Sequence, residues 1–103
     1  MDRIEKLRSY LERQPNDAFL LHALALEYVK LNDDAQAKDL FDRVLVVDPM
    51  YTGTYYHLAK LLERSGDKDA AINMYEIGME ACKKAGDEHA YRELQNAFED
   101  LVY

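Results

Sequence analysis

The chain has 103 residues, 49% of them hydrophobic, which is the size and apolar content of one globular domain. Its formal net charge is −7, and a surface of that sign repels phosphate backbones, so nucleic acid is not an expected partner. Cys82 is the only cysteine, which excludes an intrachain disulfide. Neither a signal peptide nor a membrane-spanning run is found, so the sequence predicts a cytoplasmic protein that does not enter a membrane.

A spacing of 34 residues organises the chain, and the pair Pro15 and Pro49 marks it. The few prolines and glycines, against many Ala, Leu, Glu and Lys residues, favour helices over strands. Within each period, apolar residues recur every three or four positions, which is the spacing of one helix face. The sequence therefore predicts pairs of helices that repeat along the chain.

The first predicted helix covers residues 2–14. Leu7 and Pro15 stand one period before Phe41 and Pro49, which belong to the second helix of a full repeat and its end. Residues 2–14 are therefore predicted to be the second helix of a repeat whose first helix is absent.

The first full repeat is predicted over residues 18–51. Each of its two helices carries an apolar face at helical spacing, formed by Leu21, Leu24, Ala25 and Tyr28, and then by Ala37, Phe41 and Val44. Asp33 is predicted to cap the second helix, and Gln36 completes a capping box three residues later. The unit is a helix, a short polar turn and a second helix.

The second full repeat is predicted over residues 52–85. Its apolar positions lie one period further along, at Tyr55, Leu58, Ala59, Leu62, Ala71, Tyr75 and Gly78. Each of these residues has a counterpart of similar size at the equivalent position of the first repeat, although the match of Gly78 with Val44 is loose. Gly66 is predicted to supply the left-handed residue that ends the first helix of this repeat.

A last helix is predicted over residues 87–102, with an apolar stripe at Tyr91, Leu94 and Phe98. This stripe matches the first helix of a repeat only after a shift of two residues. Gln95 then occupies a position where the other repeats have a small residue, so a further helix could not dock closely. The segment is predicted to be a capping helix.

These residues resemble tetratricopeptide repeats, whose pattern is W-x2-L-G-x2-Y, then A-x3-F, then P. The chain reads Leu21-x2-Leu24-Ala25-x2-Tyr28, Ala37-x3-Phe41 and Pro49, and then Tyr55-x2-Leu58-Ala59-x2-Leu62 and Ala71-x3-Tyr75. The resemblance is to a small bacterial-type member of the family. It implies an all-α fold with antiparallel helix-turn-helix repeats, stacked as a short right-handed α-solenoid of about six helices in a single domain, 1–103.

The resemblance also implies a scaffold or adaptor that binds a peptide or protein segment on the concave face of its first helices, and not an enzyme. The candidate binding residues lie on the side of those helices opposite the apolar core stripe. They are Phe19, His22, Leu26, Lys30, Tyr56, Lys60, Glu63, His89, Arg92 and Asn96. Some family members grip the terminal carboxylate of chaperone tails with lysine and asparagine on the first concave helix. Phe19, His22 and Leu26 occupy that helix here, so this clamp is not predicted.

No cofactor or metal site is predicted. The three histidines are far apart, and there is neither an HExxH nor a CxxC motif. Cys82 is interpreted as a structural thiol because nothing in the sequence orients it for catalysis. One alternative to a peptide-binding adaptor stays open, a homodimer or larger homo-oligomer that pairs through the spare apolar residues Phe19, Leu26 and Tyr103.

Overall fold

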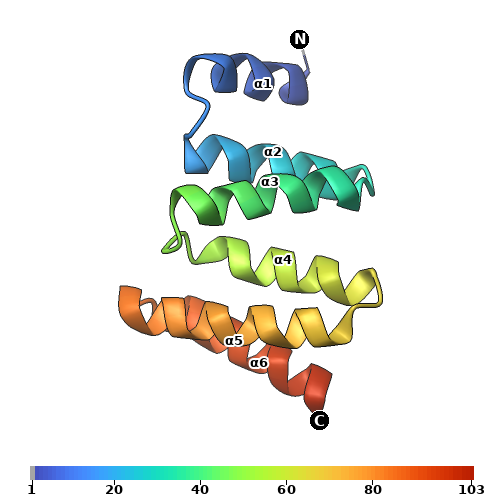
Figure 1. Ribbon diagram of the computed structural model, residues 1–103, viewed down its shortest axis with the longest axis vertical. Coiled ribbons are helices and arrows are strands. Elements are labelled where there is room, and N and C mark those ends of the chain that lie inside the picture. The colour runs from blue at the N-terminus through green and yellow to red at the C-terminus, as the bar shows by residue number, and fades with distance from the viewer. Residues whose placement is uncertain (1) are drawn as a thin grey trace. The chain divides into compact units, whose positions relative to one another are not determined.

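The computed structural model describes residues 2–103, and Met1, the first residue of the predicted domain, lies outside the described part. Six α-helices and no strand are found in residues 2–103 (Figure 1). They are α1 (Arg3–Arg13), α2 (Ala18–Lys30), α3 (Asp34–Val47), α4 (Gly53–Arg64), α5 (Lys68–Ala85) and α6 (Glu88–Val102). The predicted all-α helical repeat is confirmed.

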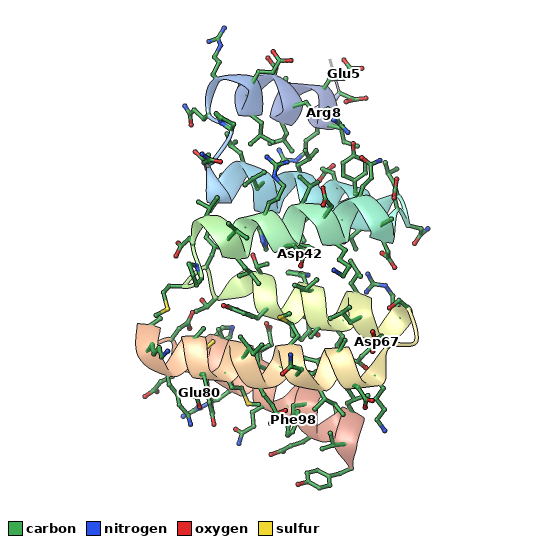
Figure 2. The ribbon with its side chains drawn as sticks, viewed as in Figure 1. Glu5, Arg8, Asp42, Asp67, Glu80 and Phe98 are labelled. Carbon is green, nitrogen blue, oxygen red and sulfur yellow. The ribbon has the colours of Figure 1, made fainter. Side chains whose placement is uncertain are left out.

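Aspartate side chains begin five of the six helices in the described chain, and each accepts a hydrogen bond from a backbone N–H of the first turn. Their distances lie between 2.8 and 3.2 Å, and the residues are Asp2, Asp17, Asp33, Asp67 and Asp87. Figure 2 labels Asp67 at the start of α5. A carboxylate at this place satisfies an otherwise unpaired donor and complements the positive end of the helix dipole.

The turns inside the two repeats use the same backbone conformation. Asn32 has φ of 58° and Gly66 has φ of 84°, and the two positions are one period apart. The left-handed residue predicted at Gly66 is thus confirmed, and asparagine takes its place in the first repeat. Both residue types tolerate positive φ better than other side chains, which allows the chain to reverse within a few residues.

The chain divides into two compact units, Met1–Pro49 and Met50–Tyr103, here called unit 1 and unit 2. In unit 1, α2 packs against α3 and, less extensively, against α1. The side chains that are fully or almost fully buried there are Leu7, Leu21, Ala23, Leu24, Ala25, Tyr28, Ala37, Leu40, Phe41 and Val44. Only Leu7 of this core belongs to α1, so the first helix is held mainly by one face of α2.

In unit 2, α5 packs against both α4 and α6. Its buried core contains Tyr55, Leu58, Ala59, Leu61, Leu62, Ala71, Tyr75, Ala81, Cys82, Leu94 and Ala97, together with Thr54 and Gly78. The small residues predicted to permit close helix contact, Ala25 in unit 1 and Ala59 in unit 2, are both 0% exposed. The predicted repeat core is therefore the core of both units.

Asp87 ties the start of α6 to the start of α4 within unit 2. Its side chain accepts hydrogen bonds from Thr52 Oγ1 at 2.7 Å and from the backbone N–H of Ala90 at 3.0 Å. The hydrogen bond from Thr52, and next the one from Ala90, hold the pKa of the Asp87 carboxyl below its usual value. Hydrogen bonds to the charged form favour that form.

Replacing Asp87 with alanine should lower the free energy of unfolding by about 1 kcal/mol at neutral pH, the usual cost of a lost N-cap. Because the carboxyl has a depressed pKa, its contribution is present above the pKa of the unfolded chain and is lost as pH falls through the folded value. The gap between wild type and variant in urea unfolding should therefore shrink at acidic pH. A gap that stays constant down to pH about 2 would contradict this account.

Candidate functional site

Four of the predicted binding residues line one shallow pocket of unit 1, here called the α2 pocket. It has a volume of about 360 Å³ and is lined by Arg3, Phe19, His22, Ala23, Leu26, Glu27 and Lys30. Phe19 is 64% exposed although it is large and apolar. The ring of His22 lies 5.6 Å from the buried ring of Phe41, so the core holds one side of the pocket in place. Apolar surface of this kind is the usual lining of a binding pocket.

Two cations and one carboxylate form the charged rim of the α2 pocket. Glu27 Oε2 lies 2.9 Å from Lys30 Nζ and 3.4 Å from Arg3 Nε. The hydrogen bond from Lys30 is the largest cause of the lowered pKa of Glu27. Burial opposes it as the next largest effect, and the positive charges of Lys30 and Arg3 lower the pKa further. The rim therefore carries one net positive charge beside exposed apolar surface.

Three predicted residues of α4 form a second arrangement in unit 2, which we call the α4 cluster together with Tyr75. Lys60 Nζ lies 5.8 Å from the centre of the Tyr56 ring and 3.6 Å from Glu63 Oε2. The Tyr75 hydroxyl donates a short hydrogen bond to Glu63, and Tyr75 itself is 0% exposed. Burial, and next the bond to Glu63, raise the pKa of Tyr75 far above its usual value. A core side chain thus fixes the surface carboxylate that in turn holds Lys60.

His57 lies next to this cluster and adds little positive charge at neutral pH. Its ring meets the Tyr56 ring edge-on at 5.7 Å. Burial and the charge of Arg64 lower the pKa of His57, while Glu93 opposes them. A lowered pKa keeps the imidazole neutral near pH 7. The α4 cluster therefore offers an aromatic face with nearly balanced charge.

The predicted residues of α6 lie in different surroundings from the α4 cluster. Arg92 lines a separate pocket of about 520 Å³ with Cys82, Lys83, Gly86, Asp87, Glu88, Tyr91 and Gln95. Lys83 Nζ lies 5.7 Å from the centre of the Tyr91 ring on the edge of that pocket. His89 and Asn96 are exposed and do not line it. The assignment of these α6 residues depends on the two-residue shift that aligns α6 with the other repeats.

Sequence reasoning missed the residues that support the predicted ones. Glu27 precedes Lys30 by three positions, a spacing that brings two side chains together on a helix. The sequence could therefore have predicted this ion pair. The repeat position of Tyr75 predicts a core residue, which is confirmed, but the hydrogen bond from its hydroxyl to Glu63 depends on how α5 packs against α4. Arg3 comes from a different helix, and no local spacing links it to the α2 pocket.

Two observations in the described residues bear on metal and thiol chemistry. Within residues 2–103, no group of three or more His, Cys, Asp or Glu side chains is arranged to hold a metal ion. Cys82 is 1% exposed, and burial followed by the charge of Asp87 raises the pKa of its thiol. A raised pKa disfavours the reactive thiolate. None of the helices described is both long and apolar enough to cross a membrane.

Comparison with known proteins identifies the repeat. Residues 52–85, the range of the predicted second repeat, match the family model of the tetratricopeptide repeat. A tetratricopeptide repeat domain protein from Salinibacter ruber is 40% identical, with 85% of this chain and 89% of that chain covered and a TM-score of 0.81. The matching fold and sequence define a helical-repeat protein. The chain belongs to the tetratricopeptide repeat family.

More distant relatives share part of the chain or only its fold. A tetratricopeptide repeat and J domain-containing co-chaperone of Fusarium oxysporum f. sp. lycopersici is 33% identical over 75 residues, which cover 73% of this chain and 14% of that protein. The chain thus spans about a seventh of that relative's length. The TPR2B domain of yeast Sti1, solved in a complex with pHsp70, is 15% identical with a TM-score of 0.88, covering 95% of this chain and 78% of that one. At that identity the likeness shows the fold.

Proposed function

We propose that this chain is a protein-interaction module that binds a peptide or protein segment on the predicted concave face of the first helix of each repeat, and that it is not an enzyme. The observation that carries the proposal is the α2 pocket, where Phe19 is 64% exposed beside Leu26 in a pocket of about 360 Å³. An exposed large apolar side chain in a concave, charge-rimmed site is typical of a surface that a partner covers.

The chemistry of the α2 pocket sets the kind of segment that fits. An apolar side chain of the partner would pack on Phe19 and Leu26, and its burial stabilises the complex at about 25 cal/mol for each Å² removed from water. A neighbouring acidic group would meet the net positive rim formed by Arg3, Lys30 and Glu27. The α2 pocket therefore favours a segment with an apolar residue next to an acidic one.

The α4 cluster supports the proposal with a different kind of contact. Tyr56 presents large area at low entropy cost, and Lys60 is already positioned by Glu63 and by the Tyr56 ring. We include His89, Arg92 and Asn96 of α6 as further contact residues because all three are exposed. The Sti1 domain with the same fold was solved in a complex with pHsp70, which supports a role in binding protein segments.

The first test is an affinity pull-down from the native cell, with the immobilised chain and quantitative mass spectrometry of what it recovers. Phe19→Ser, Tyr56→Ala and Lys60→Glu should each reduce recovery of the specific partner by about tenfold or more, which corresponds to about 1.4 kcal/mol of binding. Circular dichroism should show unchanged helix content because these side chains contribute little to the core.

Two matched variants control for nonspecific effects of the same substitutions. Val46 is an 83% exposed apolar residue on α3, and Lys38 on α3 pairs with Asp42 at 2.8 Å. Val46→Ser and Lys38→Glu should leave recovery of the partner unchanged. Equal recovery by the site variants and the wild type would refute the proposed surfaces. Recovery of nothing but further copies of this chain would favour the homo-oligomeric alternative.

A further inference from the structure

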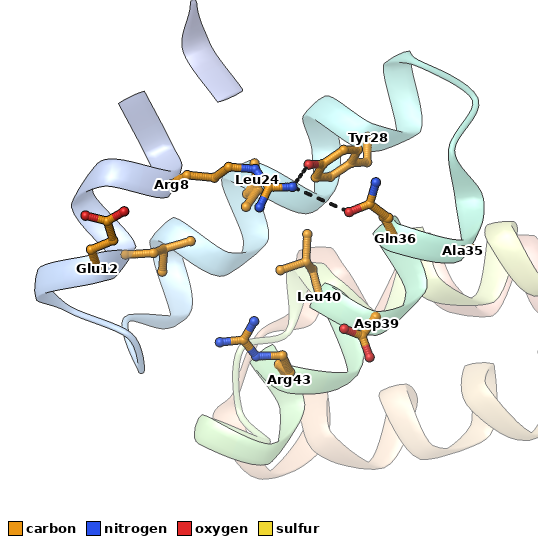
Figure 3. A pocket seen from close by; sticks show the side chains of 10 residues that line it. Arg8, Glu12, Leu24, Tyr28, Ala35, Gln36, Asp39, Leu40 and Arg43 are labelled. Carbon is orange, nitrogen blue, oxygen red and sulfur yellow. Dashed lines mark hydrogen bonds between the residues drawn. The ribbon is translucent and has the colours of Figure 1, made fainter. Parts of the chain in front are cut away.

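A larger groove of unit 1 lies on different residues from the α2 pocket. It has a volume of about 600 Å³ and is formed by side chains of α1, α2 and α3, as Figure 3 shows. Its lining consists of Arg8, Leu11, Glu12, Leu24, Tyr28, Ala35, Gln36, Asp39, Leu40 and Arg43. We call it the α1–α3 groove. Its volume lies within the range that ligand-binding clefts occupy.

The middle of the α1–α3 groove is apolar. Leu24 of α2 and Leu40 of α3 are 3% and 7% exposed, and Leu11 of α1 is half-buried. Figure 3 shows the Leu40 side chain between those of Arg8 and Arg43. The groove therefore places an apolar floor between two guanidinium groups.

Within residues 2–103, the hydrogen-bond partners of Arg8 are neutral side chains. Its Nη2 donates a short hydrogen bond to the Tyr28 hydroxyl and a longer one of 3.5 Å to Gln36 Oε1 (Figure 3). Its guanidinium carbon also lies 5.5 Å from the centre of the Tyr28 ring. None of these partners carries a charge, so the guanidinium is positioned without a charge-neutralising hydrogen bond. Figure 2 shows where Arg8 lies on α1.

Five other cations of the described chain differ from Arg8 because each has a carboxylate close by. A carboxylate lies within 4.0 Å of each of Arg3, Lys30, Lys38, Lys60 and Lys83. In residues 2–103, neither Arg8 nor Arg43 forms an ion pair, and Arg43 Nη2 donates only a long bond of 3.4 Å to the backbone oxygen of Pro15. A guanidinium that is fixed by neutral acceptors keeps donors ready for a planar carboxylate from outside.

Two carboxylates of the lining limit what the groove accepts. Glu12 follows Arg8 by four positions on α1, and Asp39 precedes Arg43 by four positions on α3. They would repel a segment with many acidic residues, so the fit is best for a single carboxylate placed at the Arg8 end. The apolar floor then takes the side chains beside that carboxylate.

We propose that the α1–α3 groove is a second docking site, which binds an apolar peptide segment whose single carboxylate pairs with Arg8 and whose leucine-sized side chains pack on the half-buried Leu11, above the small exposed parts of Leu24 and Leu40. The site goes beyond the proposed function because it shares no residue with the α2 pocket or the α4 cluster. A partner bound here would contact the second helix of the repeat and the N-terminal helix α1.

The test uses the full chain and a short synthetic peptide with blocked ends, two leucines and one glutamate, compared with the same peptide carrying glutamine instead. In an NMR titration of the ¹⁵N-labelled chain, the glutamate peptide should shift the amide signals around Arg8, Gln36 and Leu40. It should bind about tenfold more tightly than the glutamine peptide, and raising the salt concentration should remove most of that advantage.

Three variants identify the group responsible. Arg8→Gln should abolish the preference for the glutamate peptide, while Arg8→Lys should keep part of it because the charge remains without the planar donor pair. Lys38→Gln, which removes a cation of α3 outside the groove, should change nothing. Asp39→Asn should strengthen binding of the glutamate peptide because it removes a carboxylate that repels it. Asp39 lies on α3, so this variant leaves the contacts of α1 intact, which the Arg8 variants do not ensure.

Several results would overturn the proposal. One is that the glutamate peptide fails to bind at all, and another is that the two peptides bind with equal affinity. A third is that the Arg8→Gln variant, folded as judged by dispersed amide signals, keeps the full preference for the glutamate peptide. Each of these results contradicts the proposal. Amide shifts confined to Phe19 and Leu26 would also overturn it and would instead support the α2 pocket. Failure of the groove and failure of the proposed function are therefore separate outcomes, since they are read at different residues.

Discussion

Phe41→Ala should lower the free energy of unfolding by about 3–5 kcal/mol, the range measured for removing a large aromatic side chain from a packed core. Phe41 is 0% exposed on α3, and its ring lies 5.6 Å from that of His22. Removing the ring therefore leaves a cavity between α2 and α3 in unit 1. Urea unfolding followed by circular dichroism measures the loss, which is a large part of the roughly 5–15 kcal/mol that stabilises a typical domain.

The same substitution at Phe19 is the matched control. Phe19 is 64% exposed, so Phe19→Ala should change the free energy of unfolding by less than about 1 kcal/mol. This pair of variants separates a core role from a surface role for two residues of one type. A loss below about 1 kcal/mol for Phe41→Ala would show that α2 and α3 do not pack around this ring.

Gly78→Ala should lower the free energy of unfolding by about 2 kcal/mol, although alanine is the better helix former. A Cβ atom added at Gly78 would lie 2.6 Å from Tyr55 Cβ and 2.9 Å from Leu94 Cδ1. Tyr55 Cβ is attached directly to the backbone of α4, so relief requires α4 and α5 to move apart. The gain of about 1 kcal/mol in helix propensity is smaller than the cost of this overlap.

Gly53→Ala provides the comparison for Gly78→Ala. Apart from its chain neighbours and the backbone of its own helix, nothing lies within 4 Å of a Cβ built on Gly53, the first residue of α4. That variant should keep or slightly raise the midpoint of thermal unfolding, while Gly78→Ala should lower it by several degrees. If both alanine variants raised the midpoint, the close approach of α4, α5 and α6 at Gly78 would be wrong.

The fold was predictable because each core position occurs twice, once in each repeat, and the two residues can be compared. Phe41 and Tyr75 stand one period apart, and both are 0% exposed. The pair Val44 and Gly78 looked loose, yet both positions are buried, and the contact at Gly78 explains why no side chain is present there. Small residues reveal how closely helices approach when their positions in the repeat are known.

The candidate sites were less predictable because they depend on contacts between helices. Phe19, His22, Leu26 and Lys30 were found from spacing on one helix, and they do share a pocket. Arg8, in contrast, meets Tyr28 and Gln36 across 20 and 28 positions of sequence. No periodicity links those residues, and the groove that they line depends on how α1 lies against α2 and α3.

The shared left-handed turn at Asn32 and Gly66 has a consequence for how such a chain can change in evolution. Each 34-residue repeat contains its own left-handed turn residue and its own aspartate that caps the second helix, Asp33 or Asp67. Duplication of one repeat in the gene would therefore supply a helix pair that already contains its turn residue and its helix cap. Selection can then alter the outward side chains of a new copy without first having to solve its folding.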